Sequence, residues 1–251
     1  MSARAHAIDR WDDYIHDWLT QPSPPPLPAP FGEWFASYGG SVTKEAMPEP
    51  YIGRWEAPRM VMLGLNPGEA DVSFQGRNGI FAEKIGELGA YSTWAATDPY
   101  GQPVWEDRHR INRYRRELVK FTRRWTDDDE LSGADLLTVE MYPWHSKNVT
   151  ATIRPPASVL DEFVWAPLAE IAVPLFFAFG AHWALMCEQL GLKQEARWGP
   201  GGKDLGSPVK SRTVITYRLN ADQRIVVCWQ QGYAGPPRAE DVTRLRAVLG
   251  D

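Results

Sequence analysis

The sequence predicts an α/β protein, a three-layer α/β/α sandwich around a central, mainly parallel sheet of four strands. Short apolar runs alternate with longer segments of helical periodicity. The runs are continuously apolar, as expected for strands that are covered on both faces. A strand–helix–strand order favours parallel pairing. At 251 residues, 43% of them hydrophobic, the chain is long enough for one large domain.

Residues 1–30 are expected to form an N-terminal arm, and residues 31–251 the main domain. Apolar residues recur at helical spacing as far as Leu19, which predicts an amphipathic helix. Six prolines between Pro22 and Pro30 then exclude helix and central strand. We therefore expect an extended connector that lies on the main domain.

Strands and helices alternate along the rest of the chain. The four expected core strands are Arg59–Leu65, Asp135–Met141, Leu175–Phe179 and Arg224–Trp229. A further strand, Arg212–Arg218, precedes the last of these, and the turn between them predicts a hairpin. Helices are expected over residues 111–125, 158–171, 181–190 and 239–249. Ligands of such sheets bind at the carboxyl ends of the strands, so candidate functional residues are sought there.

Composition restricts the class of protein. A net charge of −5 argues against a surface coated with basic residues, although it allows a local basic groove. No stretch approaches the roughly 18 apolar residues of a membrane span, and no apolar signal segment opens the chain, so we expect a cytoplasmic protein. Cys187 and Cys228 are too few for an iron–sulfur or cysteine-rich zinc site and are expected as reduced core thiols. The histidines lack metal-ligand spacing, so no metal or cofactor is expected.

The run VMLGLNPG, residues 61–68, ends the first core strand. Gly64 and Gly68 allow the backbone to approach a ligand closely, and Pro67 favours a turn. Asn66 is then expected to project into the crevice, where its amide can hold a water molecule by hydrogen bonding. The alternative is an asparagine that caps an ordinary strand-to-helix turn.

This run resembles the first motif of the uracil-DNA glycosylase superfamily, in the G-[IL]-N-P-G form of the thymine/mismatch-specific branch. The resemblance covers roughly residues 55–250, but only the first motif is matched in sequence. It implies that Asn66 orients the water that attacks the sugar of a flipped nucleotide, with Gly64 and Leu65 beside the substrate. In the strict uracil branch a bulky residue stands two places after the catalytic position. Here that residue is Gly68, which leaves room for a substituent on C5 of the base.

The resemblance also predicts which residues hold the base. Phe81 is the expected stacking ring and Phe74 its alternative, and either residue is equally typical of a core. At the second strand end Glu140 takes the place of the family's asparagine. A carboxylate accepts from an exocyclic amine, which favours a cytosine derivative, whereas a salt-bridged glutamate is the alternative. A shifted alignment places one of three neighbours there instead: Trp144, His145 or Ser146.

The last strand end departs from the family pattern, because Gln231 stands where the strict uracil branch has a histidine. Its neutral amide is expected to donate a weaker hydrogen bond to the departing base. In the loop that follows, Tyr233 would fill the vacated space in the duplex and Arg238 would contact a phosphate. The alternative is an ordinary Gly/Pro surface loop.

A basic helix face completes the expected DNA-binding surface. Four cations of the 111–125 helix lie on the side opposite its apolar stripe: Arg113, Arg116, Lys120 and Arg124. Such a face can follow a phosphate backbone, although a solvated helix face is the simpler interpretation.

The sequence thus leads to the hypothesis of a monofunctional DNA glycosylase that acts as a monomer on double-stranded DNA. Its preferred substrate is a 5-modified cytosine, followed by mispaired thymine or uracil. No lysine nucleophile is evident, so the product is an abasic site, formed in base excision repair or in defence against modified phage DNA. One alternative is a module of the same fold that binds a modified base without catalysis. Another is an enzyme of free nucleosides or nucleotides, which the acidic net charge favours.

Overall fold

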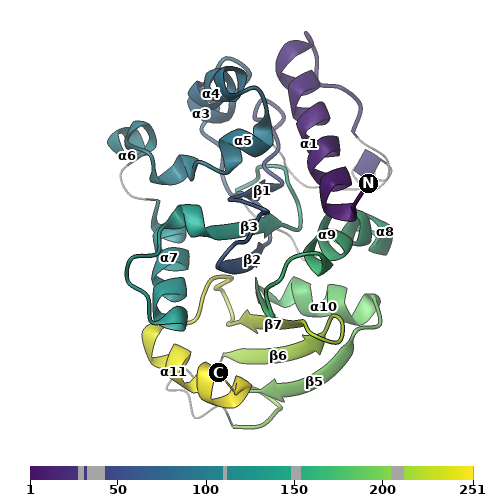
Figure 1. Cartoon of the computed structure of the whole chain (residues 1–251), viewed down its shortest axis with the longest axis vertical. Helices are drawn as coiled ribbons and strands as arrows, with labels where there is room; N and C mark the ends of the chain where they lie inside the picture. The colour runs from purple at the N-terminus through teal and green to yellow at the C-terminus, as the bar shows by residue number, and fades with distance from the viewer. Residues whose placement is uncertain (28–30, 33–42, 110–111, 148–153, 205–211, 251) are drawn as a thin grey trace.

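A computed structural model of the chain describes residues 1–27, 31–32, 43–109, 112–147, 154–204 and 212–250 (Figure 1). Its seven strands form one mixed sheet in the order β1-β3-β2-β4-β7-β6-β5. β3, β2, β4 and β7 run parallel, whereas β1 and β6 pair antiparallel with β3 and β7, and β5 pairs antiparallel with β6. The strands are β1 Tyr51–Ile52, β2 Met60–Gly64, β3 Leu136–Glu140, β4 Leu175–Phe179, β5 Lys193–Trp198, β6 Thr213–Arg218 and β7 Arg224–Trp229.

The α/β class is confirmed, but the expected number of four strands is wrong. The four expected core strands are present and parallel, and β6 and β7 form the expected hairpin. Neither β1 nor β5 is predicted by its sequence. β1 has only two residues, and β5 is a largely exposed edge strand with the polar sequence KQEARW. An edge strand buries little surface, so it needs no apolar run.

Helices cover both faces of the sheet (Figure 1). On one face, Leu63 and Val139 belong to a hydrophobic cluster that also includes α1 and α10. On the other face, Met62 and Leu136 belong to a cluster that includes α7 and α11. The longer helices are α1 Ala3–Thr20, α4 Ile80–Leu88, α6 Pro103–His109, α7 Arg113–Thr126, α10 Ala181–Gln189 and α11 Ala239–Leu249. The shorter ones are α3 Val72–Gln75, α5 Tyr91–Ala95, η1 Pro99–Gly101, η2 Gly133–Asp135, α8 Ala157–Leu160, η3 Asp161–Trp165 and α9 Ala166–Ala169.

The expected helices are present, with one irregularity. The segment expected as one helix over residues 158–171 consists of α8, a π-turn (η3) and α9. Pro167 has no N–H to donate to the preceding turn, and a widened turn accommodates that loss. Cys187 and Cys228 are buried and free, as expected. Within the described ranges, no helix is both long and apolar enough to cross a bilayer.

The N-terminal helix packs into the main core. Trp11, Ile15 and Trp18 are buried in the same cluster as the sheet residues. Ser2 caps α1, and the Glu170 carboxylate accepts a hydrogen bond from the backbone N–H of Ala3 at 2.7 Å. The connector residues 21–27 are not helical, as their prolines predict, and the last connector residues, 28–30, lie outside the described ranges.

Candidate functional site

Asn66 lies two residues after the last residue of β2, beyond the carboxyl end of that strand. The carbonyl of Gly64 accepts hydrogen bonds from the Met141 amide at 3.0 Å and from Trp183 Nε1 at 3.1 Å, which hold this end of β2 in place. Asn66 Nδ2 donates to the carbonyl of Ser146 at 2.9 Å and to its Oγ at 3.0 Å. No described residue donates to Asn66 Oδ1, so that oxygen is available to accept from a water molecule.

Glu140 ends β3, next to Gly64 on β2. The two residues are partners in the parallel register, so their side-chain positions lie on the same face. A Cβ on Gly64 would lie 2.3 Å from Glu140 Oε2 and 2.6 Å from Oε1. The glycine of the motif therefore makes room for the carboxyl group of Glu140. Glu140 Oε2 is buried and makes no hydrogen bond to any described residue.

Asn66 and Glu140 line one cavity of about 70 Å³. It lies on the face of the sheet that α7 covers, since Thr138 of β3 and Leu118 of α7 also line it. Its remaining walls come from Glu49, Ile52, Pro67, Tyr100, Asn112, Tyr114 and Arg115.

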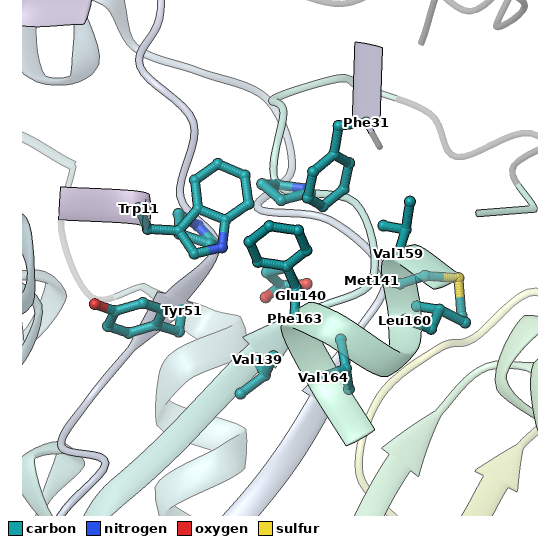
Figure 2. Close-up of a pocket in the computed structure, with 12 residues that line it drawn as sticks. Trp11, Phe31, Tyr51, Val139, Glu140, Met141, Val159, Leu160, Phe163 and Val164 are labelled. Carbon is teal, nitrogen blue, oxygen red and sulfur yellow. The ribbon is translucent and has the colours of Figure 1, made fainter. Parts of the chain in front are cut away.

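The opposite side of β3 at Glu140 is closed by apolar side chains (Figure 2). Trp11, Phe31 and Phe163 pack against one another there, with ring centroids 4.9 to 5.5 Å apart. The space that remains is about 10 Å³, room for no more than a single water molecule. Any ligand of Glu140 must therefore enter from the α7 side.

A second buried carboxylate, Glu49, faces the same cavity. It is 2% exposed, and the Tyr100 hydroxyl donates to its Oε1 at 2.6 Å. Gln75 Nε2 donates to the Tyr100 hydroxyl at 3.0 Å. His145 Nε2 lies 3.6 Å from Glu49 Oε1, too far for a hydrogen bond. His145 is 1% exposed and is not among the residues that line the cavity.

Arg115 is buried in the cavity wall and is fully occupied by partners other than Glu140. Its Nε donates to Asp98 at 2.9 Å, one terminal nitrogen donates to Thr138 Oγ1 at 2.9 Å, and the other donates to the Gly133 carbonyl at 2.6 Å. The structure therefore does not show the alternative of a salt-bridged Glu140.

The surroundings of Glu140 favour its protonated form. Burial and the charge of Glu49 raise the pKa of Glu140 to about 8, and the charge of Arg115 opposes this shift. Burial and Glu49 also raise the pKa of Tyr100 well above its usual value. At neutral pH the cavity therefore contains a mainly neutral Glu140 and a neutral Tyr100.

The structure places both expected stacking rings in the core. Phe81 is 1% exposed, and its ring lies nearly parallel to Trp105, 5.7 Å away. Phe74 is fully buried beside it, 5.2 Å from Phe81. Neither residue lines the cavity, where Tyr100 covers the edge of Phe81 at 5.6 Å. In the structure Phe81 is a core residue of this aromatic cluster, which is the alternative that the sequence also allows.

Gln231 also lies away from the cavity. It is exposed in the tight turn in which the Tyr233 amide donates to the Gln230 carbonyl at 3.0 Å. Tyr233 is 42% exposed and lies 6.0 Å from the Arg212 guanidinium, and Arg238 is exposed at the start of α11. The loop is thus a surface feature, and Gln231 is not among the residues that line the cavity.

Leu65 and Gly68 of the motif do not line the cavity, whereas the basic face belongs to the helix that forms one of its walls. Gly68 has φ +86° and open space where a Cβ would lie, and Leu65 packs on the core. Arg113 and Arg116 are exposed at the start of α7, the helix that also supplies Asn112, Tyr114 and Leu118 to the cavity wall. Lys120 pairs with Glu117 at 2.9 Å.

Among the cavity residues that the sequence did not indicate are Glu49, Tyr100 and Arg115. For Arg115 a pattern was present, because it lies three positions before Leu118 on the buried side of α7. Glu49 stands between Pro48 and Pro50, an unusual setting for an ordinary surface acid. No local pattern marks Tyr100.

Comparisons with known proteins add no relative. No protein-family model, curated protein or solved structure matches this chain. The function is therefore argued from the chemistry of the cavity.

Proposed function

We propose that the protein is a monofunctional DNA glycosylase that hydrolyses the N-glycosidic bond of a flipped pyrimidine, preferably a 5-modified cytosine. One observation carries the proposal: Asn66 and Glu140, at the ends of two neighbouring parallel strands, line the same cavity. The amide oxygen of Asn66 can hold the attacking water, and the carboxyl group of Glu140 can hydrogen-bond to the base. The resemblance of VMLGLNPG to the uracil-DNA glycosylase motif supports the same assignment.

Each cavity residue has a role in this reaction. The free Oδ1 of Asn66 accepts a hydrogen bond from the attacking water, and Ser146 keeps the amide in that orientation. The sugar develops positive charge as the bond breaks, so a positioned water suffices as nucleophile. Glu140 recognises the edge of the base. The open space at Gly68 accommodates a substituent on C5.

Double-stranded DNA is the proposed partner, bound by a monomer of the protein. Arg113 and Arg116 supply exposed charges beside the cavity mouth for phosphate contacts. In this proposal Tyr233, exposed in a surface loop, enters the duplex, and the exposed Arg238 contacts the DNA backbone. The product is an abasic site, formed in repair or in defence against modified phage DNA.

A second candidate is a module that binds a modified base without cleaving the bond. The exposed position of Gln231 favours it, because the last strand end then supplies no donor to the departing base. The two candidates differ in whether a base is released.

The test is base release from a panel of duplexes, measured by mass spectrometry. The panel contains uracil, mismatched thymine and several 5-modified cytosines, with bulk modified phage DNA in addition. Wild-type protein is expected to release one class of base, and Asn66→Ala to slow the release by about 100-fold or more, since the water is no longer positioned. Asn78→Ala, which removes an exposed asparagine outside the cavity, is the matched control and is expected to keep the wild-type rate.

Duplex binding without release would refute the glycosylase and support the module. Neither binding nor release would refute both. Equal rates for Asn66→Ala and Asn78→Ala would show that the water is held elsewhere.

A further inference from the structure

The carboxyl group of Glu140 lies in the cavity without any partner that would require its charge. Its Oε2 is buried and makes no hydrogen bond to a described residue, and Arg115 is committed to Asp98, Thr138 and Gly133. Gly64 provides the space in which this carboxyl group lies. Buried carboxyl groups that only stabilise a fold are normally paired with a cation or a hydrogen-bond donor. An unpaired carboxyl group in a cavity therefore points to a ligand.

Several titratable groups face Glu140 from the surrounding elements. Glu49, from the segment before β1, is the main charge that opposes its ionisation, and Arg115 of α7 is the one that favours it. Tyr100 also responds to its charge and remains neutral because burial raises its pKa. Tyr114 of α7 lines the cavity as well, with its side chain partly exposed. His145 adjoins Glu49 and is not among the residues that line the cavity. Burial first and the charge of Glu49 second raise the pKa of Glu140 to about 8 against the opposing charge of Arg115, which favours the protonated form at neutral pH.

A neutral carboxyl group both donates and accepts hydrogen bonds, and this determines which base it can recognise. Its hydroxyl can donate to N3 of a cytosine ring while its carbonyl oxygen accepts from the exocyclic N4 amine. Uracil and thymine already carry a hydrogen on N3, so they can hydrogen-bond to the same group but cannot take its proton at that atom. The carboxyl group therefore distinguishes cytosine from uracil and thymine by whether N3 can accept its proton, rather than by the shape of the base.

We propose, as an extension that depends on the proposed glycosylase function, that Glu140 is the general acid of the reaction and restricts it to bases of the cytosine class. The O–H bond of Glu140 breaks and an N3–H bond forms as the C1′–N1 bond breaks. The electron pair of the C1′–N1 bond goes to N1, so the base leaves as a neutral tautomer. Water adds its oxygen to C1′, and the proton it loses restores the carboxyl group of Glu140 through solvent.

This role explains two features of the site. Gln231 lies outside the cavity, and no neutral amide is needed once the base leaves as a neutral molecule. Glu49 acts through Glu140, because its charge adds to the effect of burial in favouring the protonated form of Glu140.

The experiment compares wild type, Glu140→Gln and Glu49→Gln in single-turnover release of a 5-modified cytosine across pH. The wild-type rate is expected to fall about tenfold for each pH unit above about pH 8, as the carboxyl group ionises. Glutamine keeps a donor for N3 and an acceptor for N4, so Glu140→Gln should bind the duplex within about threefold of wild type. Its rate should fall by about 100-fold or more and lose the pH dependence.

Glu49→Gln removes the opposing charge, so its rate should begin to fall at a lower pH than that of wild type. Glu83→Gln, on the exposed side of α4, is the matched control and should reproduce the wild-type profile. A second readout needs no activity: the carbon-13 resonance of the Glu140 carboxyl, assigned by its loss in Glu140→Gln, should titrate near pH 8 in the free protein.

The outcomes separate the two proposals. Release of base by wild type with an unchanged rate and pH profile in Glu140→Gln would overturn the general acid and leave the glycosylase intact. Titration of Glu140 near its usual value of 4.5, or faster release of uracil than of any cytosine derivative, would also overturn it. No release of any base by wild type would refute the glycosylase itself, whatever the carboxyl titration shows.

Discussion

The contact between Gly64 and Glu140 makes a testable prediction about stability. Gly64→Ala places a methyl group 2.3 to 2.6 Å from both carboxyl oxygens of Glu140, closer than non-bonded atoms can approach. The backbone of Gly64 is held by Met141 and Trp183, so Glu140 has to move. Overpacking of this kind costs about 1–3 kcal/mol. The lower backbone entropy of alanine in the unfolded chain offsets about 0.4–1 kcal/mol of that cost.

In a Glu140→Ala background the obstacle is gone, and Gly64→Ala should be neutral or stabilise the fold by about 0.4–1 kcal/mol. The two substitutions should therefore be coupled by about 1–3 kcal/mol. Urea unfolding of wild type, both single variants and the double variant measures this coupling. If Gly64→Ala costs the same in both backgrounds to within about 0.5 kcal/mol, the reasoning that this glycine exists to make room for the carboxyl group is refuted.

Two further predictions concern Glu140 and the basic face. Because the pKa of Glu140 is raised from 4.5 to about 8 on folding, the native state holds an extra proton between these values, and the free energy of unfolding should fall as pH rises through that range. The loss is at most about 5 kcal/mol, and comparison of wild type with Glu140→Gln by urea unfolding at pH 5 and pH 9 measures it; parallel pH profiles would contradict the shift. Replacing Arg113 and Arg116 together by alanine should reduce the slope of log affinity against log salt by about two for duplex DNA, while unfolding is unchanged. Alanine at two exposed cations on other segments, Arg54 and Lys193, is the control, and an equal effect there would show that the basic face has no special role.

The strands and helices that form the core were predictable because the pattern of apolar residues within each segment indicates which of its residues are buried. β2 and β4 are continuous apolar runs whose residues are all buried, and the amphipathic stripe of α7 matches its buried face. The edge strand β5 was not predictable, since it is exposed on most positions and is defined only by its pairing with β6. Such a strand is held by backbone hydrogen bonds to a distant segment, and these bonds do not require any particular side-chain pattern in the strand itself.

The candidate site was predictable only in part, for a related reason. Asn66 follows the predicted strand Arg59–Leu65, and Glu140 lies near the end of the predicted strand Asp135–Met141. Parallel pairing brings such ends to one edge, so their proximity follows from the strand assignment. The sequence allowed Phe81 to line a cavity or to pack in the core. Its contacts with the rings of Phe74 and Trp105 place it in the core.

By itself, the sequence determined the α/β class, the four parallel strands and the strand ends at which chemistry is possible. Only the tertiary structure decided that Glu140 lies over Gly64 without a cationic partner and that Glu49 adds a second charge to the same cavity. The physical reason is the separation along the chain over which each effect acts. Periodicity and turn preference act over a few residues, whereas burial, hydrogen-bond partners and proton affinity depend on residues that meet only after folding.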